Sequence, residues 1–85
     1  MMYFLQGQGA TSDAIFQEEG DKMKVVAEVS YTAYYDTIMS KAEARKLWQK
    51  FKTDGWVQVS KGRRTAKQIL ELRLIRFKSE LNKGK

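Results

Sequence analysis

Residues 39–59, MSKAEARKLWQKFKTDGWVQV, decide the fold of this chain, because they hold a complete helix with a signal at each end. Ser40 followed three residues later by Glu43 is a capping box, and Gly55 is the residue type that ends a helix. Apolar side chains recur at helical spacing between these signals: Ala44, Leu47, Trp48 and Phe51. The stretch therefore predicts a helix over residues 41–53 that returns at once to a strand.

Three strands are predicted before this helix. Residues 2–5 and residues 14–17 are short runs rich in apolar and aromatic types. Residues 23–35 alternate for more than ten positions, which is typical of one long, half-buried strand, and Asp36 with Thr37 breaks the pattern. We expect the polar side of this strand to be a solvated sheet face: Glu28, Ser30, Thr32 and Tyr34.

A second capping box, Thr65 with Gln68, predicts a further helix to about Leu81. The chain is too short for two domains. We therefore expect a single α+β domain over residues 1–82 and a frayed tail over residues 83–85. The predicted order is β-β-β-α-β-α, with a mostly antiparallel sheet of about four strands and two helices packed on one face.

Charge is divided unevenly along the chain, and this division is the main functional signal. The net charge of the 85 residues is +6. Residues 1–39 hold two lysines and six acids, whereas residues 40–85 hold fourteen lysines and arginines and four acids. A basic half of this kind suits nucleic acid or another polyanion, although a solvated surface without a partner would look the same.

The cationic residues fall in two groups, the first predicted helix and the loop before the second one. Free N–H groups and the helix dipole favour an anion at that second helix start. Tyr34 is the one tyrosine expected to be free for base stacking, whereas Trp48 and Trp56 are expected in the core. The predicted nucleic-acid or anion-binding residues are Lys41, Arg45, Lys46, Lys50, Lys52, Lys61, Arg63 and Arg64.

A protein–protein interaction or regulatory module is the alternative function. Beside the main apolar seam of the second predicted helix, Ile69, Leu72 and Ile75 form a second apolar stripe. This stripe predicts either burial within the molecule or a homodimer or partner contact. The basic half would also attract an acidic protein surface, and a small inhibitor stays open as a third option.

Catalysis and metal binding have few residues to use. The chain has no histidine and no cysteine, so we expect no enzyme, no catalytic residues, no metal and no cofactor. No apolar run approaches the ~18 residues of a membrane span, and no leader pattern is seen at the N-terminus. A cytoplasmic location is therefore expected.

Glu43-Ala44-x-x-Leu47-Trp48 followed by Gly55-Trp56 resembles the core of a small family of uncharacterised cyanobacterial proteins. The similarity covers about a quarter of the chain, residues 39–59. It implies an intracellular bacterial protein without known activity, and it assigns no functional residues.

Overall fold

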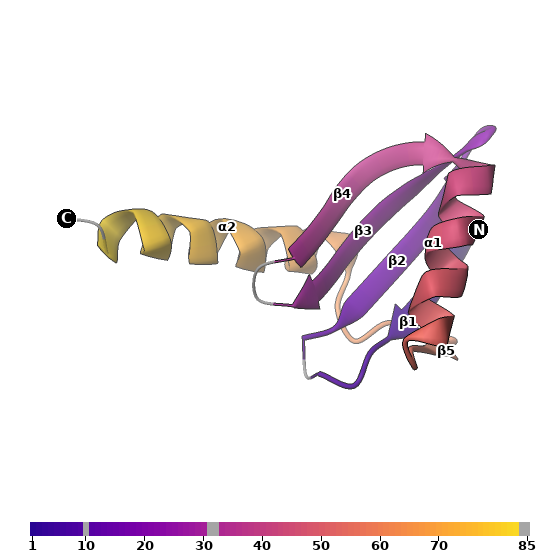
Figure 1. Cartoon of the computed structure of the whole chain (residues 1–85). Helices are drawn as coiled ribbons and strands as arrows, with labels where there is room; N and C mark the ends of the chain where they lie inside the picture. The colour runs from indigo at the N-terminus through magenta and orange to yellow at the C-terminus, as the bar shows by residue number, and fades with distance from the viewer. Residues whose placement is uncertain (10, 31–32, 84–85) are drawn as a thin grey trace.

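The computed structural model describes residues 1–9, 11–30 and 33–83, which form an antiparallel sheet and two helices (Figure 1). The α+β class is confirmed. The elements in chain order are β1 (Met2–Gln6), β2 (Asp13–Glu19), β3 (Lys22–Ser30), β4 (Ala33–Ser40), α1 (Lys41–Thr53), β5 (Val57–Val59) and α2 (Ala66–Lys83).

The sheet has five strands in the order β4-β3-β2-β1-β5, rather than the four that were predicted. Residues 23–35 are not one strand, because β3 ends at Ser30 and the chain runs back as β4. Asp36 and Thr37, predicted to break the pattern, lie inside β4. Apolar alternation continues through the reversal and no glycine or proline stands there, so periodicity alone gave no sign of a hairpin.

The two helices pack on opposite faces of the sheet, so the prediction that both lie on one face was wrong (Figure 1). α1 covers the larger core, and α2 covers Ile15 and Val26 on the other face. Alternate residues of a strand point to opposite faces, which is why both faces of β2 and β3 need a cover. The buried residues of the larger core are Leu5, Ala14, Phe16, Met23, Val25, Ala27, Ala44, Phe51 and Trp56.

α1 has the predicted bounds, and its sequence signals form the expected contacts at both ends. The Glu43 N–H donates to Ser40 Oγ at 3.1 Å. At the other end Gly55 has φ +96°, and the Trp56 N–H donates to the Phe51 carbonyl at 2.9 Å. This is a Schellman motif with its usual apolar contact, because the Trp56 and Phe51 rings stack with centroids 4.4 Å apart.

α2 begins at the predicted capping box. The Gln68 N–H donates to Thr65 Oγ1 at 3.1 Å, and the Thr65 N–H donates to Gln68 Oε1 at 2.8 Å. Its first turns lie on the sheet, after which the helix extends beyond the ends of β3 and β4 (Figure 1). The helix continues to Lys83, past the predicted end, and residues 84–85 of the predicted tail lie outside the described residues.

Replacing Gly55 with alanine should lower the free energy of unfolding by about 1–2 kcal/mol, because a Cβ is disfavoured at positive φ. Gly55→Asn should cost less, since asparagine tolerates this conformation better. Urea unfolding followed by circular dichroism measures both changes. Equal stability of the parent and the alanine variant would contradict the assigned role of the motif.

Candidate functional site

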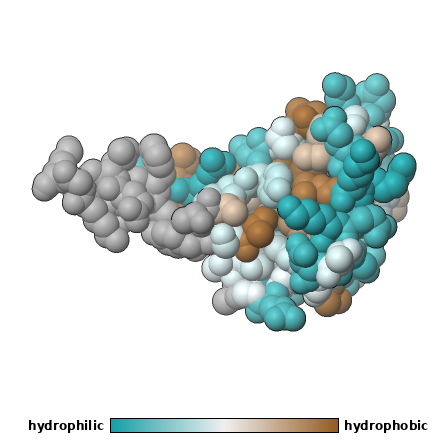
Figure 2. Space-filling model, viewed as in Figure 1, coloured by the Kyte–Doolittle hydropathy of each residue, from teal (hydrophilic) through white to brown (hydrophobic). Residues whose placement is uncertain are grey.

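The exposed surface of α1 carries five cationic side chains. Ala44 and Phe51 point into the core, and Leu47 and Trp48 pack against it, which turns the charged positions outward. Within the described part of the chain no carboxylate forms an ion pair with these cations. Figure 2 shows hydrophilic side chains gathered on the side that α1 occupies. The five exposed cations are Lys41, Arg45, Lys46, Lys50 and Lys52. At about 100° per residue Lys41, Arg45 and Lys52 lie along one line of the helix, and Lys46 and Lys50 lie along a second line about 100° or more further round.

The predicted basic loop, residues 61–64, does not lie on the same side of the sheet as the cations of α1. Gly62 lies against Phe4, because a Cβ on Gly62 would stand 2.9 Å from Phe4 Cδ1. Phe4 belongs to the cluster on the α2 side of the sheet, opposite α1. Lys61 is exposed beside it. The structure therefore separates the predicted surface into two parts on different faces of the sheet.

Arg63 and Arg64 form hydrogen bonds and ion pairs with other residues of the chain. Arg63 Nε donates to Asp13 Oδ1 at 2.9 Å, and Arg64 Nε donates to Asp13 Oδ2 at 2.8 Å. Asp13 is 3% exposed. The two guanidinium groups thus hold one buried carboxylate from both of its oxygens, so neither arginine stands free to receive a phosphate.

Glu28 extends this ionic cluster across the sheet. It faces Asp13 on the neighbouring strand, and Arg64 reaches its Oε1 at 3.0 Å. Glu28 is fully buried, so its predicted place on a solvated sheet face was wrong. Ser30 of that predicted face is exposed, and Thr32 lies outside the described residues. Tyr34 donates to Glu28 Oε2 at 3.4 Å, and the guanidinium of Arg73 lies 5.0 Å from the Tyr34 ring centroid. Tyr34, predicted as free for base stacking, is therefore already engaged.

The ionic cluster also fixes the loop between β1 and β2. Arg64 donates to the Thr11 carbonyl at 2.8 Å, and Arg63 donates to the carbonyls of Ser12 at 3.0 Å and Gly9 at 3.2 Å. Every buried side-chain nitrogen and oxygen of the described residues has a hydrogen-bond partner. The contacts of this cluster lie within the protein, and its role is to fasten the segment before α2 to the sheet.

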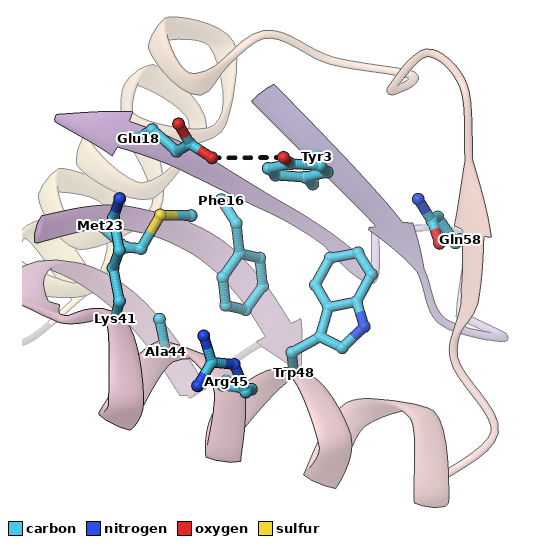
Figure 3. A pocket seen from close by; sticks show the side chains of 9 residues that line it. All are labelled: Tyr3, Phe16, Glu18, Met23, Lys41, Ala44, Arg45, Trp48 and Gln58. Atoms are coloured by element: carbon cyan, nitrogen blue, oxygen red, sulfur yellow. Dashed lines mark hydrogen bonds between the residues drawn. The ribbon is translucent and has the colours of Figure 1, made fainter. Parts of the chain in front are cut away.

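A cleft of about 370 Å³ opens where the first turns of α1 pass over a corner of the sheet (Figure 3). Its sheet side is set by strand register, because Tyr3 faces Phe16 and Glu18 faces Met23. The floor is apolar and the rim is polar. The lining residues are Tyr3, Phe16, Glu18, Met23, Lys41, Ala44, Arg45, Trp48 and Gln58.

The rim of the α1 cleft carries opposite charges on its two sides. Tyr3 OH donates to Glu18 Oε1 at 3.3 Å. The negative charge of Glu18 raises the pKa of Tyr3 above its ordinary value, and desolvation and this hydrogen bond raise it further. Lys41 and Arg45 form the helix side of the rim (Figure 3). Within the described residues no ion pair closes the cleft between the two sides.

Sequence reasoning found the cations of the α1 cleft but missed the cleft itself. Its residues come from five separate elements, and no local pattern joins them. Trp48 was predicted in the core, and it does pack against the core cluster, but one side of it lines the cleft. Alternation along β1 and β2 placed Tyr3 and Phe16 on one face, which was the only available signal.

The predicted partner stripe on α2 is only partly exposed. Ile69 is 1% exposed and lies against Ile15 and Val26, so it is part of the core and was wrongly placed in the stripe. Leu72 is 36% exposed, whereas Leu74 and Ile75 are 58% and 62% exposed. The exposed apolar side chains of α2 are therefore Leu72, Leu74 and Ile75. Leu72 and Ile75 lie about 60° apart around the helix, and Leu74 lies about 100° from Ile75.

The described residues contain no group of three or more acidic side chains placed to hold a metal ion. Within the same part of the chain, no helix has the length and apolar content needed to cross a bilayer.

No protein-family model, curated protein or solved structure matches this chain. The resemblance of residues 39–59 to uncharacterised cyanobacterial proteins therefore stays a prediction.

Arg64→Ala should lower the free energy of unfolding by about 3–5 kcal/mol, because buried Glu28 loses its one ion pair among the described residues and Asp13 loses one of its two. Lys67→Ala is the matched control. Lys67 Nζ lies 3.9 Å from Glu71 Oε1 in an exposed ion pair. Loss of this pair should change the free energy of unfolding by less than about 1 kcal/mol. Urea unfolding of both variants measures the difference, and equal small effects would show that the ionic cluster is not structural.

Proposed function

We propose that the protein binds nucleic acid through the exposed face of α1, with little sequence preference. The observation that supports this is the set of five exposed cations on α1, none of which forms an ion pair with a carboxylate of the described residues. Lysine and arginine side chains held along one helix face can follow a phosphate backbone and release its counterions. The proposed site is Lys41, Arg45, Lys46, Lys50 and Lys52.

The balance of charge on α1 favours polyanions over other partners. The helix holds one acid, Glu43, and that residue contacts the Ser40 cap. Two of the six acids of residues 1–39, Asp13 and Glu28, pair with Arg63 and Arg64 and are not available to α1. A non-enzymatic role in the cytoplasm is part of this proposal.

The double variant Lys46→Ala with Lys50→Ala should weaken binding to single- and double-stranded oligonucleotides, because two phosphate contacts are lost. Lys22→Ala with Lys24→Ala removes the same charge from the face of β3 opposite to the α1 core, and should have a much smaller effect. Fluorescence anisotropy at several salt concentrations measures both. The slope of log affinity against log salt should fall by about 1.4–1.8, or 0.7–0.9 for each lost contact.

Equal weakening by the two double variants would mean that net charge alone attracts the polyanion. Undetectable binding of the parent protein at low salt would end the proposal. Both variants keep the buried positions intact, so folding is not expected to change.

Self-association through α2 is a second candidate function, supported by the exposed apolar side chains of residues 72–75. Two copies related by a twofold axis would place these side chains against their copies, so apolar side chains would cover apolar side chains. The occupant proposed is therefore a second copy of this chain. This association uses a different helix from the nucleic-acid surface, and the two can coexist.

Sedimentation equilibrium should show a dimer whose population rises with protein concentration. Leu74→Glu with Ile75→Glu should give a monomer, because burying two carboxylates against an apolar face is unfavourable. Lys67→Ala, on an exposed and polar part of the same helix, should leave the dimer unchanged. A parent protein that is monomeric at all concentrations would refute the candidate.

A further inference from the structure

We infer that the α1 cleft binds an unstacked guanine base, with the attached phosphate on Lys41 and Arg45. The inference rests on the proposed function, because a nucleic-acid strand lying along α1 would pass the mouth of the cleft. It adds to that function a pocket for one base and a base preference.

The size and walls of the cleft suit a flat aromatic ring. Its volume of about 370 Å³ lies in the range of small-molecule sites, about 300–1,000 Å³. Phe16 forms the back, and Met23 and Trp48 stand on either side of it (Figure 3). Aromatic side chains hold single-stranded bases by contact with their ring faces.

The two rims divide the ligand into an anionic end and an end with hydrogen-bond donors. Lys41 and Arg45 on the helix side attract a phosphate, and arginine can bind its oxygens in pairs. Glu18 on the sheet side would repel a phosphate, so the phosphate has one orientation. An ionised carboxylate only accepts hydrogen bonds, so the group beside Glu18 has to donate.

Guanine fits this carboxylate better than the other bases. Its N1–H and its N2 amino group are adjacent donors on the Watson–Crick edge and can bond both oxygens of a carboxylate. Adenine and cytosine offer one amino group beside an acceptor nitrogen, and uracil and thymine place a carbonyl on each side of their N–H. Tyr3 donates one hydrogen bond to Glu18 Oε1, and a carboxylate has about four acceptor sites, so both oxygens can still accept from the base.

The test uses guanosine, adenosine, cytidine and uridine 5′-monophosphates as probes and the indole Nε1–H resonance of Trp48 as the signal. Trp56 is buried and provides an internal reference. Guanosine monophosphate should shift the Trp48 resonance and bind about tenfold tighter than the cytidine and uridine nucleotides. Glu18→Gln should abolish this preference, whereas Glu19→Gln, on the opposite face of β2, should not.

Arg45→Ala should weaken all four nucleotides, and Lys22→Ala should weaken none of them. Oligothymidylate titrated in parallel separates the two proposals. If it binds but guanosine monophosphate leaves Trp48 unmoved, or if Glu18→Gln keeps the preference, the cleft inference is overturned and the α1 surface stands. If oligothymidylate does not bind at low salt, the proposed function itself is refuted. Stronger shifts with free aromatic amino acids than with nucleotides would also overturn the guanine assignment.

Discussion

The ion pairs of Arg63 and Arg64 with the buried carboxylate of Asp13 connect distant segments of this small protein across its sheet. Asp13 begins β2, and Arg63 and Arg64 come fifty residues later, so the ion pairs close a long loop of chain. Arg64 also reaches Glu28 on β3, which ties three segments to one guanidinium group. Separating such a cluster would leave charges in a site that excludes water, and this cost exceeds that of losing an exposed ion pair. The segment before α2 is thereby fixed, although only the first turns of α2 lie on the sheet.

The same cluster explains why the charge of the sequence is a poor guide to the charge of the surface. The basic loop and the acidic strands neutralise each other inside the fold, while the cations of α1 have no acidic partner within the described residues. Of the two basic regions in the sequence, the loop before α2 forms buried ion pairs through Arg63 and Arg64, and α1 keeps an exposed cationic surface. The ionic cluster lies on the α2 side of the sheet, whereas the cations of α1 lie on the other side.

The cleft arises from the path of α1. The helix leaves β4 at one edge of the sheet, and the chain must then reach β1 near the other edge to add β5. A single helix of this length cannot cover all five strands, and the corner with Tyr3 and Glu18 stays open. The Schellman motif at Gly55 fixes the exit of the helix, since Trp56 stacks on Phe51 and anchors the turn into β5. The open corner is bordered by the first cations of α1, which is why a phosphate and a base can be considered together.

Local signals in the sequence determined what depends on neighbouring residues alone. Capping boxes at Ser40 and Thr65, the glycine at 55 and the spacing of apolar residues set both helices, because cap contacts and helical periodicity span only a few positions. The class of the fold and the cations of α1 followed from the same reasoning. Tertiary structure alone decided the hairpin between β3 and β4, the opposite placement of the helices, the burial of Ile69, the pairing of Arg63 and Arg64 with Asp13, and the cleft. Each of these depends on which distant segments meet, and that is fixed by burying both faces of the sheet and neutralising its buried carboxylates, which no short stretch of sequence records.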